Sequence, residues 1–579
     1  MRSALLCRGA ALVAASALSI TTLGVLSSPA EAHPAGDRAV NAGASWLKGQ
    51  LTNGLVHNDQ FGGFDDYGLS ADFAFALKAV GKNADAATIV NAIEPKSESW
   101  VSGADFGSPS RVYAGSLAKL VSVAQAAGED ARAFNSVNQV ARLEGRVASA
   151  GHITGRLEDA GVDSTDPFDA DFVNVIGQSF AARALTTAGS PRAVDATTFL
   201  LEQQCPEGFF REQLNPDKTS PEQGCVSGAA GSGPSVDTTA LTVINLLDTP
   251  GVSATTRGLA GAAAEWLKTQ QAADGSFSAG GTEGYNANST GLAGWALDLA
   301  GKNAAATKAA AWLRGVQVAD LAPCATRLAA ENGAIAYKPS ILSATRTAGS
   351  ITAGQRDQFR RATAQALPTL ASVPAGTGTL ALSAPATAVE KSKVTVTVSG
   401  LGAGEPGCVS FGSVSQPVTG TGDNLTVTFD LPAGAAIHTF TLATLAGTQT
   451  ATTRATLTPV PVPPVPATPE VGSLTVKKVV TARNNRFKVS LTCDDTERCD
   501  AKIVVRSARK VTVGDAARAR KVLVAKTSYS VAPGTTKRLV LKVRKPARPA
   551  LAEGRVKVKA VQSAPDADRA VTKFWLRAK

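Results

Sequence analysis

Histidine and cysteine are scarce in this sequence, which has 4 His and 7 Cys in 579 residues. Multi-ligand zinc centres and redox relays are built from these residue types, so both kinds of site have few residues available. The sequence therefore predicts no metal site and no cofactor. Charged residues make up only 18% of the chain, but hydrophobic residues make up 44%, which supplies real cores and argues against wholesale disorder.

The sequence also has a single long hydrophobic run, at residues 10–26. Arginines precede this run and the tripeptide Ala30-Glu31-Ala32 follows it, which predicts an export signal over residues 1–32. A retained membrane anchor is the alternative, although the run is short and interrupted by Ser and Thr. The C-terminus shows no hydrophobic tail and no sorting pentapeptide. We expect a secreted, extracellular protein with no transmembrane anchor after signal removal.

Charge and proline content divide the chain into regions. Residues 471–579 contain 27 Lys and Arg against 8 Asp and Glu, a net charge of +19, whereas the whole chain carries +11. Before this basic tail, the proline-rich segment 459–470 predicts a stiff polyproline II linker. Helical sequence over 33–375 gives way to alternating valines over 376–458, a period-two pattern typical of strands. The predicted order is a helical domain, a β domain, a linker and a basic β domain.

An internal repeat runs through the helical domain. Helices that end in an aromatic residue, Leu and Gln recur at Trp46, Phe199, Trp266 and Trp312, and glycine turns follow them at intervals of 40 to 67 residues. This spacing suits two helices in each unit. The helices after the turns are rich in Ala, Gly, Ser and Thr, so each has close neighbours on every side. Two concentric helical layers follow from these patterns.

The sequence Gln271-Ala272-Ala273-Asp274-Gly275-Ser276-Phe277, preceded by Trp266-Leu267, resembles the repeat of squalene cyclases and protein prenyltransferases. This resemblance implies an all-α (α/α) toroid over about 340 residues. The repeat is structural and specifies the fold better than the activity. Terpene cyclases, prenyltransferases, thioester complement-type proteins and cobalamin carriers all share this toroid.

The catalytic motifs of these families are missing. A class II terpene cyclase needs an Asp-x-Asp-Asp proton donor, a prenyltransferase needs an Asp, Cys, His zinc set, and neither pattern occurs. The thioester Cys-Gly-Glu-Gln and the common hydrolase motifs are also absent. We therefore name no catalytic residue and lean away from an enzyme.

Candidate ligand-binding residues lie where the inner helices begin, because glycine turns and helix N-termini converge there. Aromatic and acidic residues at this level would suit a sugar, a peptide or another polar ligand, and turn packing explains them equally well. Asp72, Asp237 and Asn288 each immediately precede an apolar stretch, which favours an N-cap role. The Asp169–Asp171 loop is a solvated or N-capping loop, a calcium or cation site, or a proton donor. The candidates are Asp65, Asp66, Tyr67, Asp72, Asp169, Asp171, Asn174, Asp237, Tyr285, Asn286 and Asn288.

The cysteines predict disulfides, which fit an oxidising compartment. Cys205 and Cys225 flank a Pro- and Gly-rich insertion, and Cys493 and Cys499 close a short loop in the basic tail. A metal knuckle at Cys493 and Cys499 would lack a second ligand pair. Pairing of the remaining two, Cys324 and Cys408, would join the helical domain to the first β domain.

The two β domains resemble immunoglobulin-like sandwiches of secreted proteins. Alternating cations in the basic tail favour anionic cell-wall polymers or membrane surfaces, with solubility as the plain alternative, and export argues against nucleic acid. The preferred function is a secreted, non-catalytic surface protein whose toroid binds an unknown small-molecule, glycan or protein ligand, with possible cell-wall association through the tail. The alternative is a secreted enzyme, terpene-cyclase-like or acting on a polysaccharide, that uses Asp65, Asp66, Asp169 and Asp171. A cobalamin-type carrier is a third possibility.

Overall fold

The computed structural model describes residues 34–60, 63–163, 169–280, 283–373, 378–457, 470–513, 518–565 and 567–579. The predicted export signal and the proline-rich linker up to residue 469 lie outside these ranges, as do the predicted domain boundaries at 375 and 458. The chain divides into two compact units, Met1–Thr458 and Pro459–Lys579. Within the described ranges, no helix combines the length and the apolar composition needed to cross a membrane.

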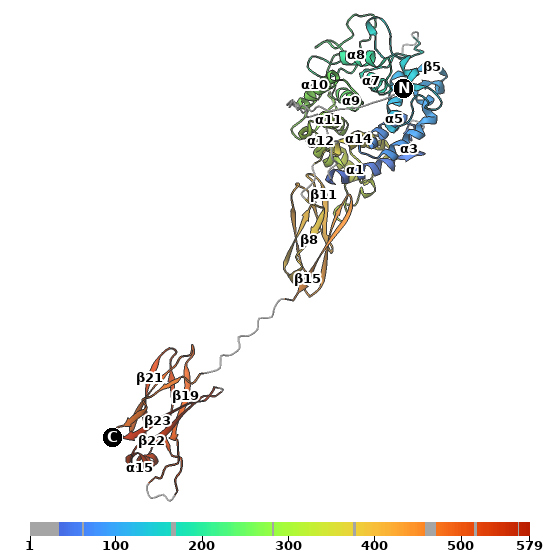
Figure 1. The fold of residues 1–579 in the computed structure, drawn as a ribbon. Coiled ribbons are helices and arrows are strands. Elements are labelled where there is room, and N and C mark those ends of the chain that lie inside the picture. The colour runs from blue at the N-terminus through green and yellow to red at the C-terminus, as the bar shows by residue number, and fades with distance from the viewer. Residues whose placement is uncertain are drawn as a thin grey trace, which may run out of the picture. The chain divides into compact units, whose positions relative to one another are not determined.

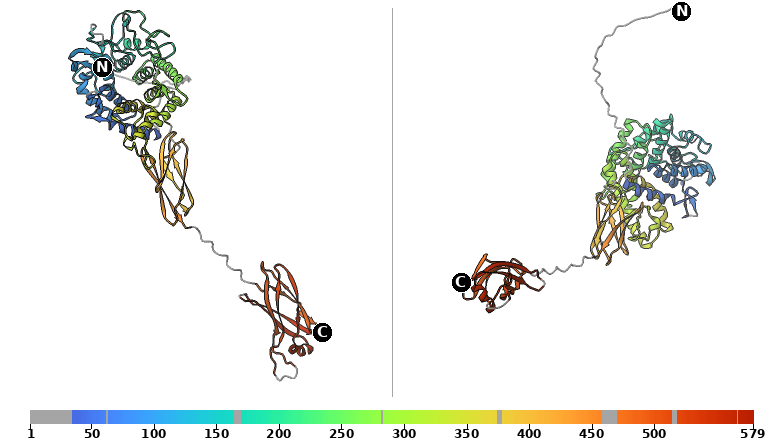
Figure 2. Two further views of the ribbon diagram at one scale, coloured as in Figure 1. Left: turned by 180° about the vertical axis from the view of Figure 1, so that it is seen from behind. Right: turned by 60° about the horizontal axis from the view of Figure 1, so that its bottom comes forward.

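Helices of the first unit form a closed inner ring surrounded by an outer layer (Figures 1 and 2). Each inner helix contacts the next, and the last returns to the first. The inner helices are α2 (Tyr67–Ala79), α5 (Ala114–Ala127), α7 (Val175–Thr187), α9 (Val236–Leu247), α11 (Ala287–Leu299) and α14 (Ala353–Leu370). This closed double layer is the toroid.

The outer helices each contact a member of the inner ring, as the repeat predicts. They are α1 (Pro34–Lys48), α3 (Asn83–Ile93), α6 (Gln139–Glu144), α8 (Ala193–Glu202), α10 (Ala254–Gln270) and α12 (Asn303–Val316). Two further helices, α4 (Ser97–Val101) and α13 (Pro339–Ala348), pack beside α5 and α12. Short strand pairs lie between helices: β1 (Leu51–Thr52), β2 (Leu55–Asn58) and β3 (Phe64–Asp65); β4 (Ser102–Gly103) and β5 (Ser108–Val112); β6 (Phe277–Ser278) and β7 (Tyr285–Asn286).

Small residues permit the close packing of the inner ring. A Cβ atom at Gly291 would lie 2.5 Å from the Gln365 carbonyl oxygen, and one at Gly294 would lie 2.3 Å from the Thr369 methyl group. Glycine at these two positions therefore allows α11 to approach α14 more closely than any larger residue would. The Thr369 hydroxyl donates a hydrogen bond of 2.6 Å to the Gly291 carbonyl oxygen across this contact.

Glutamines after the outer helices join successive repeats. The Gln271 side-chain amide donates to the carbonyl oxygens of Gly275, in its own turn, and of Ala305, in the next outer helix. The Gln317 side-chain amide likewise donates to the carbonyl oxygens of Gly333 and Ala39. Because Ala39 lies in α1, this second pair of hydrogen bonds joins the last repeat to the first outer helix. The repeated Gln and Gly thus connect adjacent helical hairpins.

Two sheets with a shared hydrophobic core follow the toroid. One has the order β13-β10-β8 and the other has the order β12-β11-β14-β15-β9. Val396, Val409 and Phe440, from both sheets, lie in the shared core. The immunoglobulin-like relationship of this first β-sandwich stays a prediction. Its strands are β8 (Ala381–Ser383), β9 (Thr387–Val389), β10 (Lys393–Ser399), β11 (Pro406–Phe411), β12 (Val414–Thr419), β13 (Leu425–Asp430), β14 (Ile437–Thr444) and β15 (Gly447–Thr456).

The toroid and the first β-sandwich are joined by a disulfide and by buried charges. Cys324 pairs with Cys408 of β11, as predicted. Glu405 accepts hydrogen bonds from Arg38 of α1 and lies 3.8 Å from the Arg314 guanidinium of α12. The side chains of Glu405 and Arg314 are 3% and 1% exposed. Burial lowers the pKa of Arg314 to about 10, although Glu405 acts in the opposite direction.

The C-terminal unit has the same two-sheet construction. One sheet has the order β16-β18-β21, the other has the order β17-β23-β22-β19-β20, and both contribute to one core. The predicted Cys493–Cys499 and Cys205–Cys225 disulfides are present as well. The elements are β16 (Ser473–Thr475), β17 (Val479–Ala482), β18 (Arg486–Thr492), β19 (Cys499–Ser507), β20 (Leu523–Val531), β21 (Thr536–Lys542), α15 (Arg548–Ala552), β22 (Val556–Ser563) and β23 (Ala570–Ala578).

Candidate functional site

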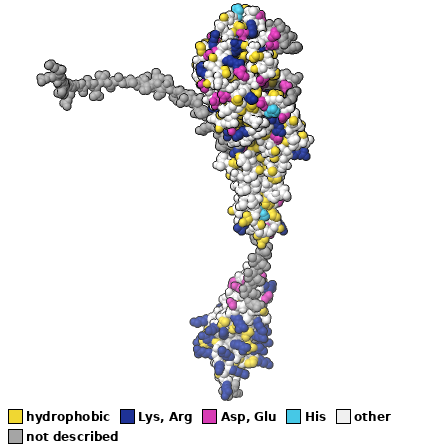
Figure 3. All heavy atoms as spheres, turned by 90° about the vertical axis from the view of Figure 1, so that its right-hand side faces the viewer, with side chains coloured by type: hydrophobic (Ala, Val, Ile, Leu, Met, Phe, Trp, Pro, Cys, Tyr) yellow, Lys and Arg dark blue, Asp and Glu magenta, His cyan; other side chains and the backbone are white. Residues whose placement is uncertain are grey.

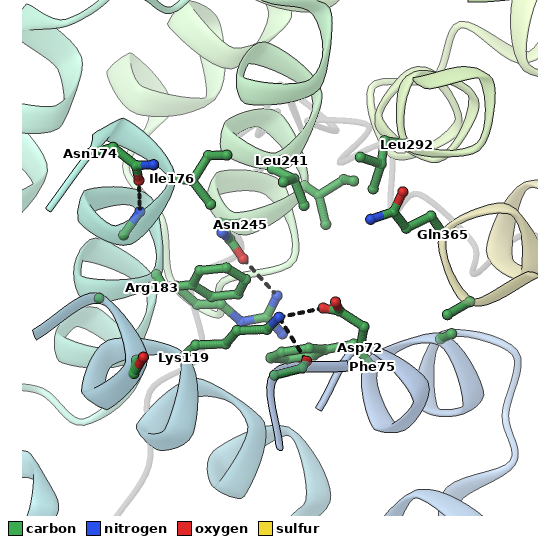
Figure 4. Close-up of a pocket in the computed structure, with 18 of the residues that line it drawn as sticks. Asp72, Phe75, Lys119, Asn174, Ile176, Arg183, Leu241, Asn245, Leu292 and Gln365 are labelled. Carbon is green, nitrogen blue, oxygen red and sulfur yellow. Dashed lines mark hydrogen bonds and ion pairs between the residues drawn. The ribbon is translucent and has the colours of Figure 1, made fainter. Parts of the chain in front are cut away.

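A cavity of about 330 Å³ lies inside the inner ring of the toroid (Figure 4). All six inner helices contribute to its wall, chiefly through their N-terminal and central turns. The lining residues include Asp72, Phe75, Trp100, Ser116, Lys119, Asn174, Ile176, Phe180, Arg183, Leu241, Ile244, Asn245, Leu292, Trp295 and Gln365. A central cavity enclosed by apolar walls with few polar groups is the usual form of a small-molecule site.

Aromatic rings form much of the cavity wall. The rings of Phe75 on α2 and Phe180 on α7 stack with centroids 5.7 Å apart. The Arg183 guanidinium lies 5.2 Å from the centre of the Phe75 ring, and the Lys119 ammonium lies 5.8 Å from the centre of the Phe180 ring. These cation–π contacts hold both cations against the aromatic wall.

The charges in the cavity are paired in a specific pattern. Lys119 Nζ lies 2.6 Å from the Asp72 carboxylate and donates to the Gly68 carbonyl oxygen at 3.0 Å. Arg183 donates to Asn245 Oδ1 at 3.4 Å and forms an ion pair with Asp248 at 2.5 Å. Asp248 does not line this cavity, whereas Asp72 does. The charged side chains that line this cavity are therefore two cations and one carboxylate.

A second cavity, of about 420 Å³, lies at the C-terminal ends of the inner helices. Its wall includes Lys78, Gln125, Thr187 and Leu299 from the last turns of α2, α5, α7 and α11. Phe75, Arg183 and Trp295 line both cavities. These three side chains therefore lie between the two cavities.

Of the predicted residues, Asp72 and Asn174 line the central cavity. Asp72 lies inside α2, so the predicted N-cap role is wrong for this residue, and Asp66 caps that helix instead. Asn174 caps α7 through a hydrogen bond from the Gly177 amide. The misplacement of Asp72 has a simple cause: α2 begins with Tyr67 and Gly68, five residues before the apolar stretch that marked the helix in the sequence.

The predicted residues at 65–67 are occupied by contacts within the protein. Asp65 accepts a hydrogen bond from His57 at 2.8 Å, and Asp66 pairs with Arg361 of α14 at 2.7 Å. Burial raises the pKa of Tyr67, with the nearby Asp65 acting in the same direction. Asp66 and Arg361 thus join the two ends of the inner ring.

Asp169 and Asp171 belong to a network around a buried arginine. Arg111, which is 3% exposed, lies 3.2 Å from both Asp159 and Asp169. Asp171 pairs with Lys218 at 2.8 Å and accepts from the amide of Asp159. Burial raises the pKa of Asp159 despite two backbone hydrogen bonds that oppose it. Both predicted aspartates therefore stabilise this loop, and neither of them lines the central cavity.

A second group of predicted residues surrounds the start of α9 and α11. Asp237 and Asn288 lie within the first turns, so their predicted N-cap roles are wrong, and Ser235 and Asn286 cap these helices. Burial raises the pKa of Asp237; the nearby Glu212 acts in the same direction and the Ser289 hydroxyl opposes both. Tyr285 is 54% exposed.

Asp237 lies one helical turn before the cavity residue Leu241 on the same helix, but it is not itself a lining residue of the cavity. Its Oδ1 atom is buried and has no hydrogen-bond partner among the described residues. A buried, unpartnered carboxyl oxygen favours the protonated form.

Sequence reasoning missed Lys119 and Arg183, which give the cavity its charge. Each is the one charged residue within a helix made largely of small and apolar residues. A cation surrounded by tightly packed small residues has one direction open, toward the centre of the ring. This isolated charge was the signal that would have located the site. The described residues contain no group of three or more His, Cys, Asp or Glu that could hold a metal ion.

Comparisons with known proteins give structural neighbours alone. No family model matches the sequence, and no curated protein matches it. A protein from Actinoplanes is 18% identical with a TM-score of 0.38, covering 58% of this chain and 99% of its own. The type II terpene cyclase MstE from Scytonema is 15% identical with a TM-score of 0.38, covering 58% and 97%. A wild-type glycosidase is 12% identical with a TM-score of 0.34, covering 58% and 95%.

Proposed function

We propose that this chain is an exported surface protein that does not catalyse a reaction: its toroid binds a small ligand in the central cavity, and its basic C-terminal unit associates with the anionic cell envelope. The observation that carries the proposal is the cavity itself, of about 330 Å³, with apolar walls and two cations. Three disulfides fit an oxidising compartment outside the cytoplasm.

The cavity favours a ligand with an apolar body and one anionic group. Ile176, Leu241, Ile244 and Leu292 supply aliphatic surface for the body. Lys119 has three donors, of which Asp72 and the Gly68 carbonyl oxygen use two, so one remains for a ligand anion. The buried Gln365 Oε1 has no partner among the described residues and offers an acceptor to a ligand hydroxyl or amide.

The contacts of Asp72 give this carboxylate a role within the protein. Its oxygen lies 2.6 Å from Lys119 Nζ, so Asp72 is the counter-ion of that ammonium group. A proton donor would instead direct its carboxyl toward a bound substrate.

Thermal unfolding of the whole chain tests ligand binding. Decanoate supplies an apolar chain with a carboxylate, and decanol supplies the same chain without charge. A ligand at about 100 times its Kd stabilises the folded form by about 2.7 kcal/mol. We expect decanoate to raise the melting temperature of the toroid by about 2 °C or more, and decanol to raise it less.

Two variants locate the binding. Leu241→Trp fills the cavity and should abolish the decanoate shift, and Arg183→Gln should reduce it. Arg132→Gln is the matched control, because Arg132 is an exposed cation that donates to the Ala188 carbonyl oxygen on the surface. An equal shift in the parent and in Leu241→Trp would contradict binding in this cavity. Absence of any shift with decanoate, cell-wall fragments, glycans and cobalamin would contradict the proposed ligand-binding role.

One observation favours the enzyme as a second candidate. The carboxyl of Asp237, one helical turn from the cavity residue Leu241, has a pKa raised by burial and by Glu212, and a carboxyl with a raised pKa is a candidate general acid. Incubation of the whole chain with polyprenyl and polysaccharide substrates, followed by mass spectrometry, tests this role. A product that is lost in Asp237→Asn and kept in Asp274→Asn would replace the binding proposal with the enzymatic one.

A further inference from the structure

One face of the larger sheet in the C-terminal unit carries cations on four neighbouring strands. Along β19, Ile503 and Val505 are buried in the core while Lys502 and Arg506 are exposed. The other strands alternate in the same way. We call this surface the basic face. Its cations are Lys502, Arg506, Lys526, Lys557, Lys559, Lys573 and Arg577.

The strand register places like charges directly opposite each other on the basic face. Arg506 of β19 pairs with Lys559 of β22, and Lys559 pairs with Lys573 of β23. Three cations therefore form a row across three adjacent strands. Like charges in directly opposite positions destabilise a sheet. Proximity to Lys502 also lowers the pKa of Lys526 on the neighbouring strand.

The described carboxylates of the C-terminal unit do not neutralise its described cations. Among the described residues from 470 to 579, no Lys or Arg forms an ion pair, whereas the first unit contains many. Figure 3 shows Lys and Arg side chains, in dark blue, over the visible surface of this unit. Asp500 shares the outward side of β19 and is the acidic residue of the face among the described positions.

An aromatic ring holds Lys557 of the basic face and one further cation, Arg555. The Arg555 guanidinium lies 4.9 Å from the centre of the Trp575 ring, and the Lys557 ammonium lies 5.8 Å from it. Lys557 and Trp575 are directly opposite each other in the register. Trp575 therefore keeps two cations ordered beside the charged row.

We propose that the basic face binds a linear phosphodiester polymer of the cell envelope, with the Arg506–Lys559–Lys573 row at the centre of the contact. Adjacent strands lie about 4.8 Å apart and alternate residues about 7 Å apart, so the face carries a regular array of positive charge. A polymer with one phosphate in each repeat matches such an array, and the release of its counter-ions drives binding. The Cys493–Cys499 disulfide fits an oxidising compartment outside the cytoplasm, which favours an envelope polymer over nucleic acid. This inference rests on the envelope association in the proposed function and names its surface and its chemistry.

The experiment measures binding of the whole chain to purified poly(glycerol phosphate) at about 50 to about 300 mM NaCl. The test variant is Arg506→Gln with Lys559→Gln and Lys573→Gln. The control removes three cations from the outer side of the other sheet, Lys488→Gln with Arg538→Gln and Lys542→Gln. All six side chains are exposed, so thermal unfolding should show both variants folded.

We expect the test variant to lose at least about tenfold in affinity at low salt and the control less than about threefold. Each contacted phosphate adds about 0.7 to 0.9 to the slope of log K against log salt, so the slope should fall by about 2 in the test variant. Equal losses in both variants would overturn the basic face as the site.

Binding only to anionic phosphatidylglycerol vesicles, or only to a DNA duplex, would overturn the polymer assignment. Sedimentation with whole cell walls separates this inference from the proposed function. If the parent chain does not sediment with walls, the envelope association itself fails. If the parent and the test variant sediment equally, the association stands and the basic face is wrong. Ligand binding by the toroid is independent of either result.

Discussion

Two aspartates on inner helices show how surroundings decide the chemistry of a residue. Asp72 lies 2.6 Å from the Lys119 ammonium group and forms an ion pair with it. Asp237 has a buried oxygen without a partner among the described residues, and burial raises its pKa. The same side chain is thus a counter-ion in one helix and a site of unfavourable charge in another.

Replacement of Asp237 by asparagine should stabilise the protein at neutral pH. In the unfolded chain this carboxyl titrates near pH 4, and in the folded chain it titrates at a higher pH. The stability of the parent therefore falls as the pH rises from about 4 through the raised pKa, because the buried group becomes charged. The neutral amide of the variant carries no such penalty. Urea unfolding at about pH 7.5 and about pH 3.5 should show a gain at the first pH only.

Asp274→Asn provides a control of opposite sign. The Ser276 hydroxyl donates to Asp274 at 2.6 Å and lowers the pKa of that carboxyl. Its stabilising contribution is present above the unfolded pKa and is lost as the pH falls through the folded pKa. This variant should lose stability at about pH 7.5 and match the parent in acid. A gain at neutral pH in both variants would contradict the explanation for Asp237.

At the scale of single residues, the sequence located the region of the site better than the site itself. It placed Asp72 and Asn174 where the inner helices begin, and both line the cavity. The sequence could not show that Lys119 lines the cavity and Asp169 does not, because the partner of Asp169 is Arg111, 58 positions away in the chain. Ion pairs between distant positions decide which charges face a ligand, and no local pattern records them.

At the scale of the helix and strand, the repeat motif explains how the toroid closes. The amides of Gln271 and Gln317 each bridge a glycine turn to another outer helix. This role was partly predictable, since the recurring Gln and Gly marked the repeats in the sequence. The helix starts were predicted less well because polar and glycine residues, such as Gly68 at the start of α2, begin helices without an apolar signal.

Gln317→Leu should weaken the closure of the ring. The Gln317 residue is 4% exposed, and its side chain satisfies the carbonyl oxygens of Ala39 and Gly333. Leucine would leave both carbonyl oxygens without this donor, at about 1 to 3 kcal/mol for each. Gln270→Leu, at an exposed position of a similar motif, is the control and should change the free energy of unfolding by less than about 0.5 kcal/mol. Equal effects would contradict the bridging role.

Removal of the charged row on β19, β22 and β23 should stabilise the protein, unlike the Gln317 substitution. Removing the three cations of the row relieves two directly opposed pairs, each worth roughly 0.2 to 1 kcal/mol. The variant with Gln at 506, 559 and 573 should therefore unfold at a higher temperature than the parent in low salt. Differential scanning calorimetry of the whole chain measures this transition. A lower unfolding temperature for the C-terminal unit would show that the row has a stabilising role.

At the scale of the whole molecule, the order of helical and β regions was predictable from periodicity, but the contact between the toroid and the first β-sandwich was not. Cys324 and Cys408 suggested a covalent link. Glu405, by contrast, carries no signal in the sequence for a partner in the helical domain, yet Arg38 and Arg314 surround it. Its burial depends on two domains meeting, which a local pattern does not report.

Glu405→Gln should destabilise the first unit strongly. The substitution leaves two buried guanidinium groups without their carboxylate, a change that costs about 3 to 5 kcal/mol. Asp430→Asn is the matched control, because the Lys393–Asp430 pair is 73% and 75% exposed and is worth about 0 to 1 kcal/mol. Chemical unfolding monitored by tryptophan fluorescence compares them. A loss below about 1 kcal/mol for Glu405→Gln would show that water replaces the carboxylate.

The side chains that the two cavities share, Phe75, Arg183 and Trp295, have a consequence for communication across the ring. Each of them lines both cavities, so a ligand that displaces one of these side chains in the central cavity also changes the wall of the second cavity. Occupancy of one end of the toroid would then alter the shape offered to a molecule at the other end, without any movement of the helices themselves.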